Sequence, residues 1–232
     1  MRLLFPKNCV CCQRVLPFQK RRGGICDACS PKVFFTGSYT CNRCGKPLRV
    51  PFESLCKDCK KRSHAFIRGR ALFVYSGPMK MAMYRFKYSN CRYMGDYFGK
   101  VAVEKYGKWL GEMAPDGIVP VPMYEGKRRL RGYNQAEVFG RALSKEIGVP
   151  LYGDFLIRKK NTLPQKGLNH RKRQENLKNA FKIKGIDVKL NCVLIVDDIY
   201  TTGTTIDEVT RILLDYGVQR VYFLTICIGS DY

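Results

Sequence analysis

The segment Val193-Leu-Ile-Val-Asp-Asp-Ile-Tyr-Thr-Thr-Gly-Thr-Thr205 decides the fold class of this chain. Its run of branched apolar residues is typical of a central strand in a parallel sheet, which is buried on both faces. The strand ends in Asp197 and Asp198, and a loop of threonines and one glycine leads into a helix expected from about 204 to 216. Because ligands of open α/β sheets bind at the carboxyl ends of the strands, the same segment also predicts a binding site.

The loop that follows the two acids has the chemistry of a phosphate site. Backbone N–H groups and threonine hydroxyls of Thr201–Thr205 can point at a phosphate, aided by the N-terminus of the helix. Gly203 allows the backbone to approach a ligand closely. The carboxylates suit sugar hydroxyls, either directly or through Mg²⁺ and its waters. A plain strand–turn–helix with an N-cap would explain the threonines but not the pair of acids.

The rest of the chain supplies the other elements of an α/β fold. We expect strands at 68–76, 118–122 and 221–227, and helices at 79–88, 95–109 and 134–147. Strands that alternate with helices indicate a parallel sheet. The 232 residues are enough for one ordinary domain and a small additional module.

Cysteine is concentrated near the N-terminus, where nine of the twelve fall within the first 59 residues. Two Cys-x-x-Cys pairs supply the four sulfurs of a tetrahedral zinc site, so four pairs predict two structural zinc ions. The pairs are Cys9/Cys12, Cys26/Cys29, Cys41/Cys44 and Cys56/Cys59. Pairing in sequence order closes the shortest loops, and a cross-braced arrangement is the alternative. Redox or iron–sulfur chemistry is the other use of such pairs.

Two residues near the pairs fall outside this pattern. Cys11 is interpreted as a spare thiol, although a Cys-x-Cys turn would let it compete with Cys9 or Cys12. His64 follows the last pair, and a lone histidine there is interpreted as a surface residue rather than a ligand.

The formal net charge is +23 and is unevenly distributed. Residues 1–60 and residues 158–189 each carry a net +9, whereas residues 191–232 carry −4. This distribution indicates a polyanionic partner, and a basic surface without a specific partner is the alternative. No stretch approaches the roughly 20 apolar residues of a membrane span, and the N-terminal apolar run is too short for a signal peptide. We therefore expect a cytoplasmic protein.

The segment 193–205 resembles the signature of the type I phosphoribosyltransferases. The resemblance implies that Asp197 and Asp198 hold the ribose hydroxyls of phosphoribosyl pyrophosphate, which binds with Mg²⁺. It also implies that the residues after the acids bind the 5′-phosphate. These residues are Tyr200, Thr201, Thr202, Gly203, Thr204 and Thr205.

An upstream segment extends the resemblance. Val119–Pro122 followed by Lys127–Gln135 is similar to the pyrophosphate-contacting region of the glutamine amidophosphoribosyltransferases. By this resemblance Val121, Pro122 and Lys127 contact the ligand. The glutaminase domain of those enzymes, with its leading cysteine, is missing from this chain, so ammonia from glutamine is excluded.

A second segment, from about 158 to 178, corresponds in position to the flexible loop that closes over the substrate of these enzymes. Gln165 is its expected ligand contact and Arg173 its expected catalytic residue. If transfer occurs, the departing pyrophosphate would be stabilised by basic side chains, and no general base is evident. The basic residues are Lys127, Arg128, Arg131 and Arg173.

The whole chain resembles the ComF/GntX family, a double zinc ribbon followed by a type I phosphoribosyltransferase domain. The resemblance implies a ribbon at 1–62 and a phosphoribosyltransferase-like domain at 63–232. Its members serve DNA uptake in natural transformation, or the use of external DNA, and are thought to act beside a helicase-like ATPase. Supporting motifs are Leu4-Phe5-Pro6, Phe86-Lys87-Tyr88, Arg131–Glu137, Arg173-x-x-Asn176 and Val196–Thr205.

Two functional hypotheses follow. The first is a Mg²⁺-dependent phosphoribosyltransferase with an unknown acceptor. The second is a non-enzymatic adaptor that binds single-stranded DNA and docks the helicase-like ATPase. Phe86, Tyr88 and Tyr93 lie among basic residues and could stack on bases, or they could form the buried stripe of a helix.

Overall fold

The computed structural model describes residues 8–17, 24–50, 52–159, 180–184 and 188–230. Its centre is a four-stranded sheet in the order β1-β6-β5-β2, in which every neighbouring pair is parallel. The strands are β1 (Arg68–Val74), β2 (Gly117–Pro120), β5 (Cys192–Tyr200) and β6 (Arg220–Ile228). This confirms the α/β fold class with a parallel central sheet. β5 lies between two neighbours, as its unbroken apolar run predicts.

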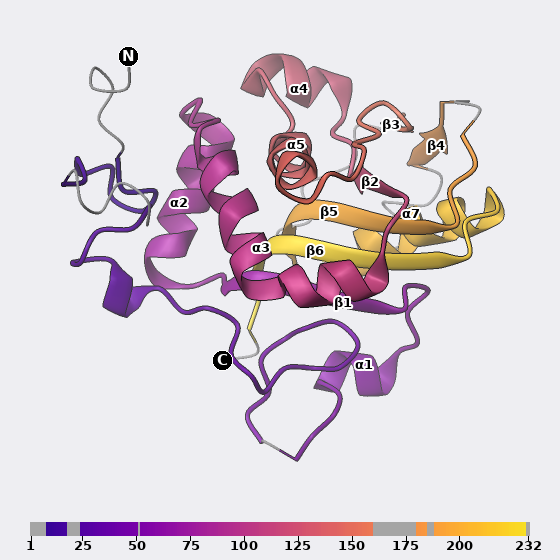
Figure 1. The fold of residues 1–232 in the computed structure, drawn as a ribbon, viewed down its shortest axis with the longest axis horizontal. Helices are drawn as coiled ribbons and strands as arrows, with labels where there is room; N and C mark the ends of the chain where they lie inside the picture. Colours follow the sequence, from indigo (N-terminus) through magenta and orange to yellow (C-terminus); the bar gives the residue numbers. More distant parts are fainter. Residues whose placement is uncertain (1–7, 18–23, 51, 160–179, 185–187, 231–232) are drawn as a thin grey trace.

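Helices cover both faces of the sheet (Figure 1). On one face lie α2 (Gly77–Tyr88), α3 (Met94–Met113) and α5 (Gln135–Ile147). On the other lies α7 (Thr204–Asp215), which packs against β6 and against the two-stranded sheet of β3 (Leu156–Arg158) and β4 (Phe181–Ile183). Side chains alternate along β5, so Leu194 and Val196 join the first core whereas Val193 and Ile195 join the second.

Most elements fall where the sequence predicts them, and three differences bear on the site. α2 begins at Gly77, because Pro78 is tolerated in the first turn of a helix. β5 continues to Tyr200, so the two acids stand within the strand rather than after it. The short basic helix α4 (Glu125–Arg131) was not foreseen, because it buries no residue and has no apolar period.

The segment predicted as a flexible loop is described only at its margins. Arg158 belongs to β3, not to a loop, and it pairs with Phe181 of β4. Arg158, at the start of the segment, and Phe181, just beyond its end, therefore belong to two adjacent antiparallel strands. Gln165 and Arg173 lie outside the described residues.

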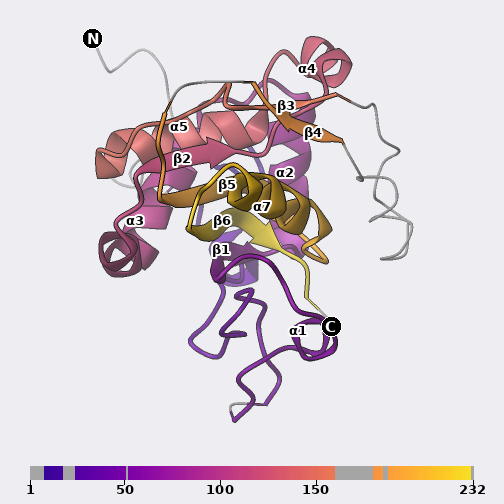
Figure 2. The same cartoon turned by 90° about the vertical axis from the view of Figure 1, so that its right-hand side faces the viewer.

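The described N-terminal residues form two small cysteine-rich units, the first beside α2 and the second below β1 (Figures 1 and 2). The first ribbon, which holds Cys9–Cys29, shares the core of α2 and α3. The second ribbon (residues 41–61) contains α1 (Lys57–Lys61) and shares the core of α7. The linker between them runs antiparallel to β1, with the N–H of Thr36 donating to the carbonyl of Leu72 at 3.1 Å. Within the described residues no helix is long and apolar enough to cross a membrane.

Candidate functional site

Asp197 and Asp198 stand at the carboxyl edge of the sheet, near the end of its inner strand β5. Asp197 pairs in register with Thr225 of β6, and its Oδ1 accepts the backbone N–H of Asp198 at 2.8 Å. Both carboxylates are partly exposed, whereas the strand residues before them are buried. The two adjacent acids thus stand at the carboxyl edge of the sheet, where the sequence predicts a binding site.

A lysine from α2 partners the second acid. Nζ of Lys87 lies 2.9 Å from Oδ2 of Asp198, and the two side chains are 21% and 18% exposed. Burial disfavours the charge of Lys87, but the charge of Asp198, its hydrogen bond and the charge of Asp197 together outweigh this effect, so the pKa of Lys87 is raised. The ion pair ties α2 to the end of β5.

Asp197 has the more unusual environment of the two acids. Crowding by the surrounding protein and the adjacent charge of Asp198 raise its pKa to about 8, although the charges of Lys87 and Arg158 oppose the shift. Arg158 also has a lowered pKa because of burial. Lys87 therefore pairs directly with Asp198, and Arg158 lies close enough for its charge to act on Asp197.

The 201–205 loop connects this edge to α7. Gly203 is the N-cap residue of α7 and has φ +82°, in the left-handed region that favours glycine. A Cβ there would lie 2.5 Å from the hydroxyl of Tyr200, so no larger residue fits. Thr202 and Thr204 share a hydroxyl hydrogen bond of 3.0 Å. The loop places the N-terminus of a 12-residue helix directly after the acids.

Tyr200 lies beneath this loop rather than at its surface. Its ring is 4% exposed and stacks on Phe223 with ring centroids 4.8 Å apart. Its side chain supports the loop from within the core of α7. A direct contact between Tyr200 and a ligand stays a prediction.

The β2 edge brings a second basic group beside β5. The N–H of Val121 donates to the carbonyl of Val196 at 2.9 Å, so Val121 and Pro122 follow β2 next to the acids.

Nη2 of Arg131, at the end of α4, donates to the hydroxyl of Tyr88 at 3.0 Å. Lys127 has a lowered pKa because of burial and the charges of Arg158 and Arg131. A cavity of about 320 Å³ separates α4 from β3 and is lined by Pro122, Arg128 and Arg158.

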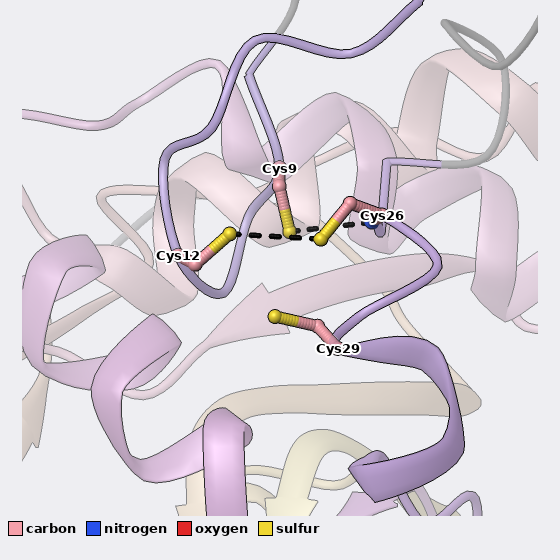
Figure 3. Close-up of side chains that lie close together, drawn as sticks. All are labelled: Cys9, Cys12, Cys26 and Cys29. Atoms are coloured by element: carbon pink, nitrogen blue, oxygen red, sulfur yellow. Dashed lines mark hydrogen bonds between the residues drawn. The ribbon is translucent and has the colours of Figure 1, made fainter.

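The eight paired cysteines form two separate clusters. The sulfurs of Cys9, Cys12, Cys26 and Cys29 all lie within 4.8 Å of one another, and so do those of Cys41, Cys44, Cys56 and Cys59. Figure 3 shows the first four side chains converging on a common centre. Pairing in sequence order is confirmed and cross-bracing is wrong. Four thiolates around one point fit a structural zinc ion, with no position left for a substrate.

The two residues outside the pattern behave differently. Cys11 is buried and belongs to neither cluster, so its interpretation as a spare thiol is confirmed. The interpretation of His64 as a surface residue is wrong, because it is 5% exposed and its Nδ1 lies 2.7 Å from Oδ2 of Asp207. Its partner is distant in sequence, so no local signal could have revealed the burial.

Sequence reasoning named Lys87 only as part of a motif and gave Arg158 no role at the acids. The signal for Lys87 was weak, because a basic residue near the end of a helix is common.

Of the three aromatic residues at 86–93, Phe86 is fully buried whereas Tyr88 and Tyr93 are exposed. The helix period of α2 turns Phe86 inward and Tyr88 outward.

Comparison with known proteins agrees with both parts of the chain. Residues 1–60 match the double zinc ribbon domain family, and residues 134–231 match the phosphoribosyl transferase domain family. "Competence protein F" of Haemophilus influenzae is 28% identical over 94% of this chain and 95% of its own. "DNA utilization protein YhgH" of Escherichia coli K12 is 27% identical over 97% and 98%. "Competence protein ComFC" of Bacillus subtilis is 26% identical over 83% and 79%.

The chain therefore carries a double zinc ribbon and a phosphoribosyl transferase domain, and its homologues are competence and DNA utilization proteins.

Proposed function

We propose that this zinc-ribbon and phosphoribosyl transferase-domain protein binds phosphoribosyl pyrophosphate, or a similar phosphosugar, together with Mg²⁺ at the end of β5. The observation that carries the proposal is the meeting of the acid pair with the 201–205 loop at the N-terminus of α7. Helix N-termini favour phosphate, and carboxylates favour sugar hydroxyls and hydrated Mg²⁺. Basic residues of α4 flank the same edge.

Each part of the edge has a role in this proposal. Thr201–Thr205 bind the 5′-phosphate, and Asp197 and Asp198 hold the ribose hydroxyls or the waters of Mg²⁺. Lys127 and Arg131 face the pyrophosphate, next to Val121 and Pro122. Gln165 and Arg173, beyond the described residues, belong to the predicted flexible loop and would contact the bound ligand from there. Mg²⁺ would neutralise charge on the pyrophosphate oxygens.

Lys87 acts in this proposal as a resident counter-ion. Its ammonium holds Asp198 in the ligand-free protein at 2.9 Å. A ribose hydroxyl or a metal-bound water that reaches Asp198 must share the carboxylate with Lys87. The ammonium would then turn toward the pyrophosphate, which Arg131 also faces in this proposal. The charge of Arg131 already acts on Lys87.

Transfer of the ribosyl group remains part of the proposal. Positive charge would develop at C1 of the ribose while the C1–O bond to pyrophosphate breaks, and Arg131 and Arg173 would stabilise the negative charge that leaves. No acceptor follows from the described residues. The protein would act in the cytoplasm, in DNA uptake or the use of external DNA, as the names of its homologues suggest.

A second function, a non-enzymatic adaptor for single-stranded DNA, is favoured by an exposed aromatic face. Tyr84 and Tyr88 of α2 are each 58% exposed, with ring centroids 5.0 Å apart. The guanidinium of Arg131 lies 4.8 Å from the ring of Tyr88. Exposed tyrosines beside a cation can stack on bases. Docking of a helicase-like ATPase belongs to this alternative, and DNA affinity that falls steeply with salt would support it.

Calorimetric titration with phosphoribosyl pyrophosphate and Mg²⁺ tests the proposal. The double variant Asp197→Asn/Asp198→Asn should lose saturable binding while it keeps two zinc ions per chain. A matched control, Asp96→Asn/Asp215→Asn, removes two exposed carboxylates on helices and should bind as the wild type does. Equal binding by both double variants would refute the site.

A further inference from the structure

We propose that His64 is a positioning residue that clamps the 201–205 loop to the second ribbon. The proposal deepens the function above, since the loop is the proposed phosphate site. Its structural part, the clamp itself, rests only on contacts between residues of this protein.

The clamp is a buried pair that joins residues 143 positions apart in the chain. Nδ1 of His64 lies 2.7 Å from Oδ2 of Asp207, and the side chains are 1% and 8% exposed. The other carboxylate oxygen accepts the backbone N–H of Ala65 at 3.0 Å. Both oxygens of Asp207 are thus used by the segment that follows the second ribbon. A charge-assisted bond in such a site is strong.

Asp207 belongs to the first turn of α7, directly after the loop. Its own N–H donates to the carbonyl of Gly203 at 2.8 Å, which closes the first turn of the helix. Holding Asp207 therefore holds the place where the loop becomes helix. A fixed N-terminus keeps its N–H groups pointing at one ligand position.

The imidazole also packs against the loop itself. Its Cε1 would lie 3.0 Å from a Cβ at Gly203, so the ring and the glycine backbone are in close contact. On its face it stacks on Phe66, with ring centroids 4.8 Å apart. Phe66 in turn meets the edge of Tyr200, which lies beneath the loop. The ring is therefore fixed on one side and supports the loop on the other.

The opposite end of the clamp is set by the second ribbon. Arg43 lies inside the Cys41-x-x-Cys44 pair, and its Nη2 donates to the carbonyl of His64 at 2.6 Å. The carbonyl of Arg43 accepts the N–H of Gly69, in β1, at 2.7 Å. A Cys-x-x-Cys turn that holds a metal has a fixed backbone. The contacts run from the second cysteine cluster through Arg43 and His64 to Asp207.

This arrangement predicts that the phosphate affinity of the loop depends on His64. Without the imidazole, the first turn of α7 loses one anchor and the loop must be ordered by the ligand instead. Ordering on binding lowers affinity. We expect a loss of about tenfold in affinity for phosphoribosyl pyrophosphate, the equivalent of one charged hydrogen bond.

Hydrogen exchange and calorimetry on the full chain test the clamp together. The variants are His64→Ala, His64→Asn and Thr36→Val. The amide of asparagine can still donate to Asp207 from near the position of Nδ1. Thr36 is the matched control, because it is fully buried and its hydroxyl bonds the carbonyl of Ala71 at 2.6 Å, in β1 rather than in α7. Zinc content is measured for each variant.

In His64→Ala, with two zinc ions retained, amides 201–207 should exchange at least about tenfold faster, and affinity should fall by a similar factor. His64→Asn should recover most of both, and Thr36→Val should change neither. Equal exchange in His64→Ala and Thr36→Val would overturn the clamp. If the wild type binds no phosphosugar but amides 201–207 still exchange faster in His64→Ala, the proposed function is refuted and the clamp stands.

Discussion

The two ribbons are alike in sequence and different in what they touch. Each has two Cys-x-x-Cys pairs, yet the first packs on the face of α2 and α3, and the second on the face of α7. The first meets α2 where Arg85 donates to the carbonyl of Cys11. The second meets α7 through the buried pair of His64 and Asp207.

Because of this difference, each ribbon packs against a different helix of the candidate site. α2 carries Lys87, which holds Asp198, and α7 begins at the 201–205 loop. The first ribbon therefore supports the counter-ion of the acids, and the second supports the loop. Metal sites that look redundant in the sequence are not equivalent in the fold, because each stabilises the element against which it packs.

Removal of one cluster at a time should give the largest effect. Cys56→Ser/Cys59→Ser and Cys26→Ser/Cys29→Ser should each lose one zinc per chain, and a structural zinc contributes about 10 kcal/mol or more to the order of its ribbon. Loss of the second cluster should also speed the hydrogen exchange of amides 201–207. Loss of the first should leave those amides protected. Equal exchange in the two variants would show that the ribbons are equivalent.

Replacement of the counter-ion on α2 should have the next largest effect. Lys87→Met leaves Asp198 beside Asp197 without its nearest cation, and we expect a loss of about 2 kcal/mol, somewhat below the cost of breaking a fully buried pair. Urea unfolding at neutral pH measures it. The double variant Lys87→Met/Asp198→Asn is the control, and it should recover most of the loss, because no unpaired charge remains. No recovery would mean that Lys87 acts through packing.

The sequence predicts the elements of the site well and their partners poorly. The buried run of β5, its two acids and the glycine of the next loop form a local pattern, so the strand, the turn and the start of α7 follow from it. Lys87 and His64 are different, because each meets an acid more than 100 residues away. Local periodicity shows which way a side chain faces, but it does not give the identity of a distant partner.

The raised pKa of Asp197 should make the free energy of unfolding depend on pH. The pKa of Asp197 is raised to about 8, so the folded state holds a proton that the unfolded state, with a carboxyl near 4, has already released. Stability should therefore fall as pH rises from about 4 to about 8. Asp197→Asn should weaken that slope, and chemical unfolding at pH 5.5 and pH 8 measures it. An unchanged slope would mean that Asp197 is ionised in the folded protein. Binding of a phosphosugar that needs the carboxylate should change in the opposite direction.

The smallest effect should come from the outer contact of the first ribbon. The hydroxyl of Tyr93 donates to Oε1 of Gln13 at 2.8 Å, and the tyrosine is 44% exposed. Water can replace an exposed hydrogen bond, so Tyr93→Phe should cost about 0.5 kcal/mol or less. The rate of zinc release to a chelator should stay that of the wild type. Faster release would mean that the ordering of the first ribbon depends on this surface contact rather than on the core that Cys9 and Leu16 share with α2 and α3.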